Sequence, residues 1–194
     1  GFGTLWLAPR LKRLYEKHPR IQINLMLEEK FLNLSMREAD VAIRLQPPSE
    51  ADLIQRKLSS IRINFYATVD YIGKRGLPKN IDELASNHRL ICYDPDSSQI
   101  SAAQRFIAPF LTRKDFSLLL LNNYYGIFRA VRNGLGVGTL PAYVAIDFPE
   151  LVQVLPEYQS EVLPIYIAYP QEIKKSKRLT AFKDFIIDEF KKNS

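Results

Sequence analysis

The sequence predicts an α/β fold arranged in two lobes, and three observations lead to this prediction. Segments with the spacing of amphipathic helices alternate with segments in which every second residue is apolar. A chain of 194 residues with 46% hydrophobic residues can bury a proper core, which argues against disorder. A turn-rich stretch begins near residue 70, and this change of texture indicates a second lobe.

The first expected element is a helix that ends at His18. Leucines recur at helical spacing between residues 7 and 14, and Pro9 either opens the regular part of this helix or kinks it, because proline lacks a backbone N–H. A strand follows over residues 21–28, where isoleucine and leucine alternate with polar residues. The chain thus begins with a helix followed by a strand.

Residues 32–39 suit a short helix, and residues 41–45 suit a strand that the following prolines end. The clearest strand is predicted over residues 61–69, where apolar and polar residues alternate. Asn80 can cap a short helix over residues 81–85. Strands that alternate with helices in this way predict parallel sheets covered on both faces.

The second half continues the alternation. Asn122 or Asn123 can cap a helix that ends at Asn133 and Gly134, as expected of a helix that stops on a left-handed glycine, and Gly136, Gly138 and Pro141 indicate a tight return. The remaining predicted elements are strands at 90–93, 118–121, 152–155 and 163–168 and helices at 102–110 and 179–190.

Composition excludes several classes of protein. The formal net charge of +6 suits nucleic acid or an anionic small ligand, but the basic runs at 174–178 and 191–192 are interpreted as a solvated rim. Cys92 lies in an apolar run and is expected to be a buried core residue, compatible with a reducing compartment. No apolar stretch approaches the roughly 20 residues that cross a bilayer. We therefore expect a cytoplasmic protein that does not contact the membrane.

The usual catalytic and metal-binding patterns are also missing. His18 and His88 are the two histidines and lack the spacing of a metal site, and no Gly-x-Ser-x-Gly motif is present. The glycines at 134–138 follow a helix and lack the lysine of a nucleotide-binding loop, so we interpret them as hinge geometry. The sequence therefore predicts no enzyme, no metal site and no cofactor.

The order of several segments resembles the effector-binding domain of LysR-type transcriptional regulators. The string ADVAIR at 39–44 resembles the family's Asp followed by a buried strand and a basic residue. The string AVRNGLGVGTLP at 130–141 is similar to a helix ending in a glycine-rich return to the hinge. Further matching segments lie at 3–19, 53–58, 69–72, 76–78 and 82–84, whereas residues 94–117 depart from the family and its first strand is not found.

This resemblance implies a fold like that of type 2 periplasmic binding proteins, with two Rossmann-like lobes joined by a two-crossover hinge. Lobe I would comprise residues 1–68 and 143–194, and lobe II residues 69–142. A small, anionic metabolite would bind in the cleft between them and change the hinge angle. The resemblance also implies dimers or tetramers. It further implies that DNA would be bound only through a winged helix-turn-helix domain upstream of Gly1. The chain opens without a Met and is expected to be a fragment.

Helix starts and strand ends supply the candidate ligand contacts, because free backbone N–H groups and the helix dipole favour anions, and open α/β sheets bind ligands at the carboxyl ends of their strands. Each candidate also has an ordinary structural explanation, namely helix capping, an ion pair of an arginine with Glu28 or Glu29, or packing within a strand. The candidate residues are Phe2, Gly3, Thr4, Arg44, Gln46, Tyr66, Thr68, Asn122, Asn123 and Thr139.

Two other functions fit a two-lobed α/β fold. A periplasmic solute-binding protein of a transporter would share the hinge but would carry a signal peptide in place of the helix-turn-helix domain. A small cleft enzyme would need a catalytic constellation that the sequence does not contain.

Overall fold

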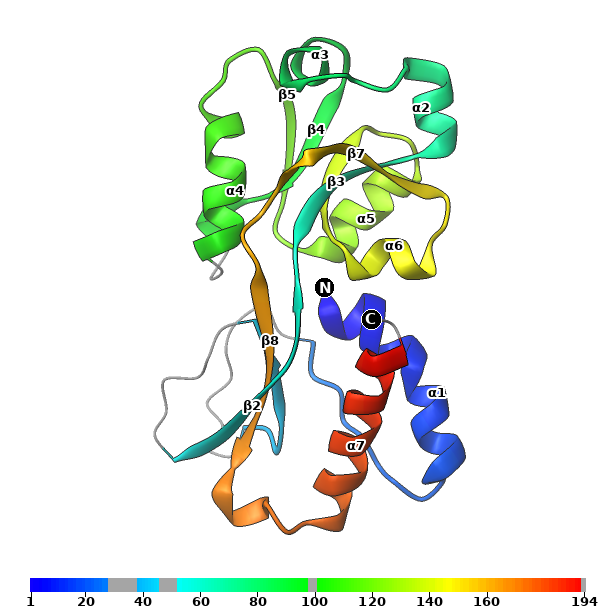
Figure 1. Ribbon diagram of the computed structural model, residues 1–194, viewed down its shortest axis with the longest axis vertical. Coiled ribbons are helices and arrows are strands. Elements are labelled where there is room, and N and C mark those ends of the chain that lie inside the picture. Colours follow the sequence, from blue (N-terminus) through cyan, green and yellow to red (C-terminus); the bar gives the residue numbers. More distant parts are fainter. Residues whose placement is uncertain (28–37, 46–51, 98–100, 193–194) are drawn as a thin grey trace. The chain divides into compact units, whose positions relative to one another are not determined.

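The computed structural model describes residues 1–27, 38–45, 52–97 and 101–192 (Figure 1). The chain divides into two compact units, and after Gly1 it passes between them twice. Unit 1 contains Gly1 and Ile61–Val162, and unit 2 contains Phe2–Ser60 and Leu163–Ser194. Both units combine helices with β-strands, which confirms the predicted α/β class.

Unit 2 packs two helices against a small sheet. Its sheet has the strand order β1-β8-β2, and β1 is antiparallel to β8. The elements are the π-helix η1 (Gly3–Leu7), α1 (Ala8–Lys17), β1 (Ala42–Arg44), β2 (Leu53–Ile61, whose last residue falls in unit 1), β8 (Leu163–Pro170), η3 (Gln171–Ile173) and α7 (Lys177–Lys192). Pro9 stands at the beginning of α1, where its missing N–H costs nothing, so it opens the α-helix.

Aromatic and ionic contacts join the first and last helices of unit 2. The ring of Phe190 stacks on Trp6 at a centroid distance of 4.4 Å, and Phe2 stacks on Trp6 at 4.9 Å. The guanidinium of Arg10 lies over the Trp6 ring, and Glu189, which is 1% exposed, accepts a hydrogen bond from Arg13 at 2.7 Å. Elements from the two ends of the sequence therefore form one core.

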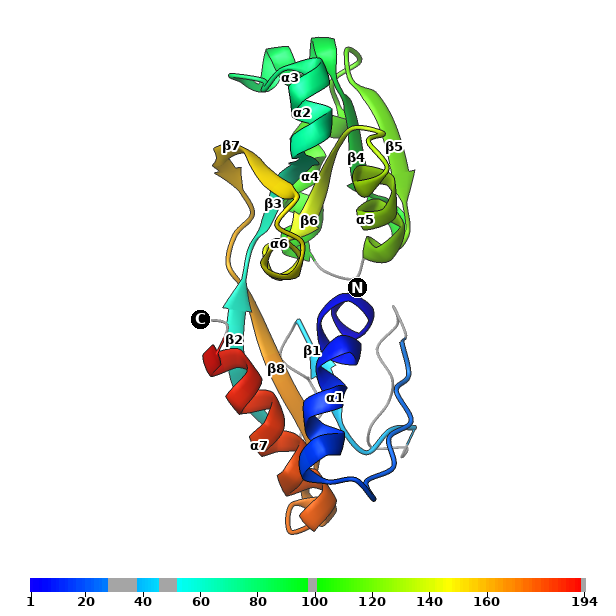
Figure 2. The same ribbon diagram turned by 90° about the vertical axis from the view of Figure 1, so that its right-hand side faces the viewer.

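Unit 1 is built on a five-stranded sheet with the order β5-β4-β6-β3-β7. Its strands are β3 (Ile63–Thr68), β4 (Arg89–Tyr93), β5 (Ser117–Leu121), β6 (Val137–Pro141) and β7 (Leu151–Gln159). Its helices are α2 (Val69–Arg75), α3 (Ile81–Asn87), η2 (Pro95–Ser97), α4 (Ser101–Leu111), α5 (Tyr124–Arg132) and α6 (Tyr143–Asp147). Figure 2 shows these elements from the side.

The sheets are mixed, which corrects the prediction of parallel sheets. Strand β4 is parallel to β5 and β6, but β3 is antiparallel to both β6 and β7. Alternation of helices and strands identifies the layers of an α/β fold, whereas strand direction depends on where each crossover returns. Here only β3 runs against the other four strands, since β7 is antiparallel to β3 and therefore has the same direction as β4, β5 and β6.

The core of unit 1 lies on one face of the sheet under α2, α3 and α4. Phe65 is fully buried there, and its ring lies 5.3 Å from those of Phe106 and Phe110. Helix α5 covers the other face at Gly138, where an added Cβ would lie 2.2 Å from a methyl of Val131. The predicted helix at 102–110 is confirmed as α4.

Two predictions about local structure were wrong. In place of the predicted tight return at Gly136, Gly138 and Pro141, the chain forms the interior strand β6. Gly136, just before β6, permits close approach of the Arg89 backbone, and Gly138 within it permits close approach of α5. The strand predicted over 21–28 is not formed at residues 21–27. The alternation itself is present, because the odd-numbered side chains up to residue 25 are half-buried and the even-numbered ones are exposed. The helix predicted at 32–39 lies mostly outside the described residues.

The bounds of the two units differ from those of the expected lobes. The first crossover lies near residue 61 and the second near residue 162, whereas the resemblance placed them at 68 and 142. Helix α6 and strand β7 belong to unit 1, because β7 pairs with β3 from Phe65 to Thr68.

Candidate functional site

Several polar side chains gather near the carboxyl ends of the parallel strands in unit 1. Strands β4, β5 and β6 run in the same direction, so their carboxyl ends lie at one edge of the sheet. Asn122 and Asn123 follow β5 directly, and Asp94 follows β4. The first residues of the antiparallel β3 reach the same edge, where Asn64 pairs with Leu140.

The two asparagines after β5 have different roles. The Asn123 side chain caps α5, and its Oδ1 accepts a hydrogen bond from the backbone N of Gly126 at 2.7 Å. Its Nδ2 donates to Oδ1 of Asn122 at 3.2 Å, and Asn122 is exposed. The prediction that one asparagine caps the helix is therefore confirmed, and Asn122 keeps its own amide group at the surface.

Tyr66 and Asn64 form a buried polar pair on one face of β3. The Asn64 amide donates to the Tyr66 hydroxyl at 3.2 Å, and burial raises the pKa of Tyr66 despite this hydrogen bond. Asn64 is 6% exposed, and its Oδ1 has no hydrogen-bond partner within the described part of the chain. A buried polar atom of this kind is costly unless another group, such as water or a ligand, satisfies it.

The two threonines expected in the cleft are buried within unit 1. Thr68 caps α2 by accepting from the Tyr71 backbone N at 3.2 Å. Thr139 lies opposite Phe65 in the β3–β6 ladder and is 1% exposed, so it faces away from Tyr66, the next residue along β3. The structure therefore places Tyr66 and Thr139 on opposite faces of the sheet.

In unit 2, the candidate contacts Phe2, Gly3 and Thr4 form the start of the first helix. No side chain caps this start, and its first turn contains no acidic residue. Thr4 lies inside the π-helix, so the alternative that it is the N-cap was wrong, whereas Phe2 packs on Trp6 as the alternative expected. Single π-turns of this kind are rare and often occur at functional sites.

The last pair of candidates belongs to β1 and the segment after it. Arg44 ends β1, is 6% exposed and pairs with Tyr166 in the β1–β8 ladder. Gln46, together with Glu28 and Glu29 as expected partners of Arg44, lies outside the described residues.

Sequence reasoning missed Asn64, and it also missed the contact of Tyr93 with Tyr124, whose rings lie 4.9 Å apart at the carboxyl edge. Asn64 stands at a polar position of an alternating strand, a pattern that predicts exposure, and only the sheet and its covering helices bury it.

The described residues contain no cluster of three or more His, Cys, Asp or Glu that could hold a metal ion. None of the helices described is long and apolar enough to cross a membrane.

Comparison with known proteins gives a consistent result over the whole chain. The sequence profile described as "LysR substrate binding domain" matches residues 1–191. An HTH-type transcriptional regulator of Haemophilus influenzae is 28% identical over 172 residues, which are 87% of this chain and 59% of the relative. The regulator CrgA of Neisseria meningitidis serogroup C is 26% identical over 96% of this chain and 63% of its own length. The chain thus spans about three fifths of the length of these relatives.

Solved structures agree in fold. The regulatory domain of CrgA from Neisseria meningitidis superposes with a TM-score of 0.77 at 23% identity, covering 97% of this chain and 93% of that domain. The full-length virulence activator AphB of Vibrio cholerae superposes with a TM-score of 0.68 at 25% identity, covering 97% of this chain and 65% of AphB. These likenesses establish the fold of LysR-type regulatory domains.

Proposed function

The chain belongs to the LysR family of transcriptional regulators as its substrate binding domain, and from this premise we propose that it senses a small anionic metabolite and assembles with copies of itself. It would act in the cytoplasm and catalyse no reaction. The relatives named above are regulators of transcription, so a transporter's solute-binding protein is the less favoured alternative.

The proposal of an anionic effector rests mainly on the helix start in unit 2, which no side chain caps. The first-turn N–H groups of a helix have no partner within the helix, and the dipole adds a partial positive charge. At the start of this helix neither a side-chain cap nor an acidic residue offsets this charge. A carboxylate or phosphate of the effector would accept hydrogen bonds from backbone N–H groups at Gly3 and Thr4, with the Thr4 hydroxyl as a further donor.

The surface amide of Asn122 is the second proposed contact. It adjoins the start of α5, whose first turn also contains no acidic residue. Because Asn123 already caps this helix, Asn122 can donate to a ligand without loss of the cap. The expectation that one effector contacts both predicted lobes stays a prediction.

Charge reversal at Asn122 gives the sharpest test of this proposal. The Asn122→Asp variant places a carboxylate near the start of α5, which should maintain or raise the melting temperature because of the helix dipole. Anion binding should fall, because the new carboxylate repels the ligand. The measurement is the shift in melting temperature with a panel of small carboxylates and phosphates, followed by calorimetric titration of any ligand found.

A second variant addresses the helix start in unit 2. Thr4→Val removes the hydroxyl at nearly constant shape and should weaken the same ligand about tenfold, since a hydrogen bond to a charged group contributes about 1.5 kcal/mol. Thr180→Val is the matched control, because the exposed Thr180 hydroxyl only donates to the Ser176 carbonyl within α7. Equal affinity in all three variants would refute the proposed contacts.

Self-assembly is supported by two apolar surfaces. Strand β5 is the edge strand of its sheet, and Leu120 on it and Tyr125 just after it are each 42% exposed. The segment 21–27 exposes Met26 and Leu27 and has no strand partner among the described residues. An open strand edge and an extended apolar segment are suited to pair between two copies of the chain.

The Leu120→Lys variant tests this assembly. A charged side chain on the edge strand should shift the chain toward monomer in sedimentation or light scattering at equal concentration. Leu77→Lys is the control, because Leu77 is 55% exposed but lies in the loop between α2 and α3. A wild-type chain that is monomeric at high micromolar concentration would argue against self-assembly through this domain.

A further inference from the structure

The net positive charge of this protein lies in only one of its two units. Unit 1 carries ten basic and ten acidic side chains, whereas unit 2 carries 17 basic and 11 acidic ones, so the whole formal net charge of +6 lies in unit 2. Such a division is invisible along the sequence, because unit 2 is assembled from the two ends of the chain.

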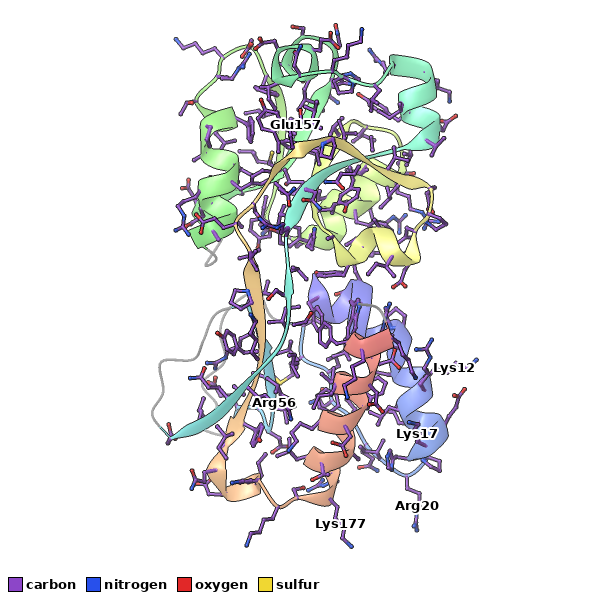
Figure 3. All side chains as sticks on the ribbon, in the orientation of Figure 1. Lys12, Lys17, Arg20, Arg56, Glu157 and Lys177 are labelled. Carbon is purple, nitrogen blue, oxygen red and sulfur yellow. The ribbon has the colours of Figure 1, made fainter. Side chains whose placement is uncertain are left out.

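Within unit 2, six of the 17 basic side chains lie together at one end. Helices α1 and α7 are antiparallel, since Trp6 near the start of the first helix stacks on Phe190 near the end of the last. The end of α1 and the start of α7 therefore lie at the same end of the unit, as both ribbon views show (Figures 1 and 2). Figure 3 shows Arg20 and Lys177 extending from the ribbon there.

We call this surface the basic end. Its six exposed cations are Lys17, Arg20, Lys174, Lys175, Lys177 and Arg178. The same segments carry two exposed carboxylates, Glu16 and Glu172, which leaves a surplus of four positive charges. None of the six cations makes an ion pair with any residue in the described part of the chain. Their charge is therefore not used to hold the fold together.

The position of the four cations next to the start of α7 is also unfavourable for that helix. Lys177 and Arg178 stand in the first turn of α7, which contains no acidic residue, and Lys174 and Lys175 directly precede it. The positive end of a helix dipole favours anionic side chains and disfavours cations. These cations repel one another and oppose the helix dipole, so an anionic partner bound there would relieve an unfavourable charge arrangement.

We propose that the basic end of unit 2 contacts the phosphate backbone of duplex DNA, in addition to the effector binding proposed above. The surface offers flexible lysines and arginines without a built pocket, which suits sequence-independent contact with a regular row of phosphates. It modifies the expectation that this family's DNA contacts come only from the helix-turn-helix domain. None of the six cations is a proposed effector contact, so the effector proposal and this one are tested on different residues and can fail independently.

Fluorescence anisotropy of a labelled duplex of arbitrary sequence tests this proposal on the 194-residue chain. The variant Lys174→Gln, Lys175→Gln, Lys177→Gln removes three charges from the basic end. The control Lys74→Gln, Lys79→Gln, Lys114→Gln removes three charges from exposed lysines of unit 1, so both variants have the same net charge. Neutral residues at the start of α7 relieve the conflict with the dipole, so the first variant should melt at the same or a higher temperature.

The wild-type chain is expected to bind weakly, with a dissociation constant of about 10⁻⁴ to 10⁻⁶ M that rises steeply with salt. The unit 2 variant should lose tenfold or more of this affinity at low salt, with a log–log salt slope flatter by about 2 to 3, as roughly 0.9 per lost phosphate contact predicts. The control should bind like wild type. Equal loss in both variants, no binding at low salt, or equal competition by polyglutamate would overturn the proposal, the last result favouring an acidic protein partner.

Discussion

Unit 1 and unit 2 hold their helices to a sheet by different means. In unit 1 a five-stranded sheet carries a continuous apolar core that runs from Phe65 to Phe116 and Leu155. In unit 2 the apolar core described around Ile167 and Leu179 is smaller, and the contact of its two helices also depends on the buried carboxylate of Glu189. Apolar packing contains no charge that protons can neutralise or salt can screen, whereas an ionic contact responds to both, so substitutions in these two sets of contacts should have different effects.

The largest loss of stability is expected from a substitution in the core of unit 1. Phe65→Ala removes a fully buried ring that contacts Phe106 and Phe110, and it should lower the free energy of unfolding by roughly 3–5 kcal/mol. Urea unfolding followed by circular dichroism measures this loss. Leu77→Ala, at an exposed loop position, is the control and should change stability by less than about 0.5 kcal/mol. Comparable losses in the two variants would contradict the assigned core.

An intermediate effect is expected from the ionic contact in unit 2. Glu189→Gln leaves the buried Arg10 and the nearby Arg13 without their carboxylate. We expect a loss of about 2 kcal/mol, below the value for a fully buried pair because Arg13 is half exposed. Asp188→Asn, at an exposed position of the same helix, is the matched control. The comparison of the units fails if both substitutions are neutral in urea unfolding.

A smaller effect is expected from pH in unit 1. His88 is 5% exposed, its Nδ1 lies 3.1 Å from the Tyr71 hydroxyl, and burial lowers its pKa from the ordinary 6.5, helped by Arg75 and opposed by Glu83. The unfolded chain therefore binds a proton more readily than the folded chain. Stability from neutral His88 is complete above about pH 6.5 and declines as the pH falls below it.

The His88→Gln variant isolates this contribution. The difference in melting temperature between pH 7.5 and pH 5.5 should be smaller in this variant than in wild type. His18→Gln changes the exposed histidine at the end of α1 and should leave the difference unchanged. An equal reduction in both variants would mean that burial of His88 is not the cause.

The smallest effect is a chemical one and leaves stability unaltered. Cys92 is fully buried in the core of unit 1, and burial raises the pKa of its thiol to about 12. Since the thiolate is the reactive form, the native chain should react with a disulfide reagent far more slowly than the chain in denaturant. A Ser86→Cys variant adds an exposed thiol that should react at once. Rapid reaction of native Cys92 would show that unit 1 opens easily.

Local interactions explain where sequence reasoning succeeded. Asn80 and Asn123 cap α3 and α5 as predicted, because the side chain and the backbone N–H it binds are three residues apart. Gly134 adopts a φ of +74° after α5, as a glycine at a helix end should. The candidate contacts at strand ends and helix starts were chosen from the same local order of elements, and their role in ligand binding stays a prediction.

The sequence by itself determined the α/β class, most helices and strands and their caps, and the family resemblance, all of which depend on spacing along the chain. Only the tertiary structure decided that Asn64 is buried, that Tyr66 and Thr139 lie on opposite faces, and that β6 is an interior strand. It also decided that the basic side chains from both ends of the chain share one unit. Strand partners and surface neighbours lie far apart in sequence, and the pattern along one segment carries no information about which distant segment will meet it.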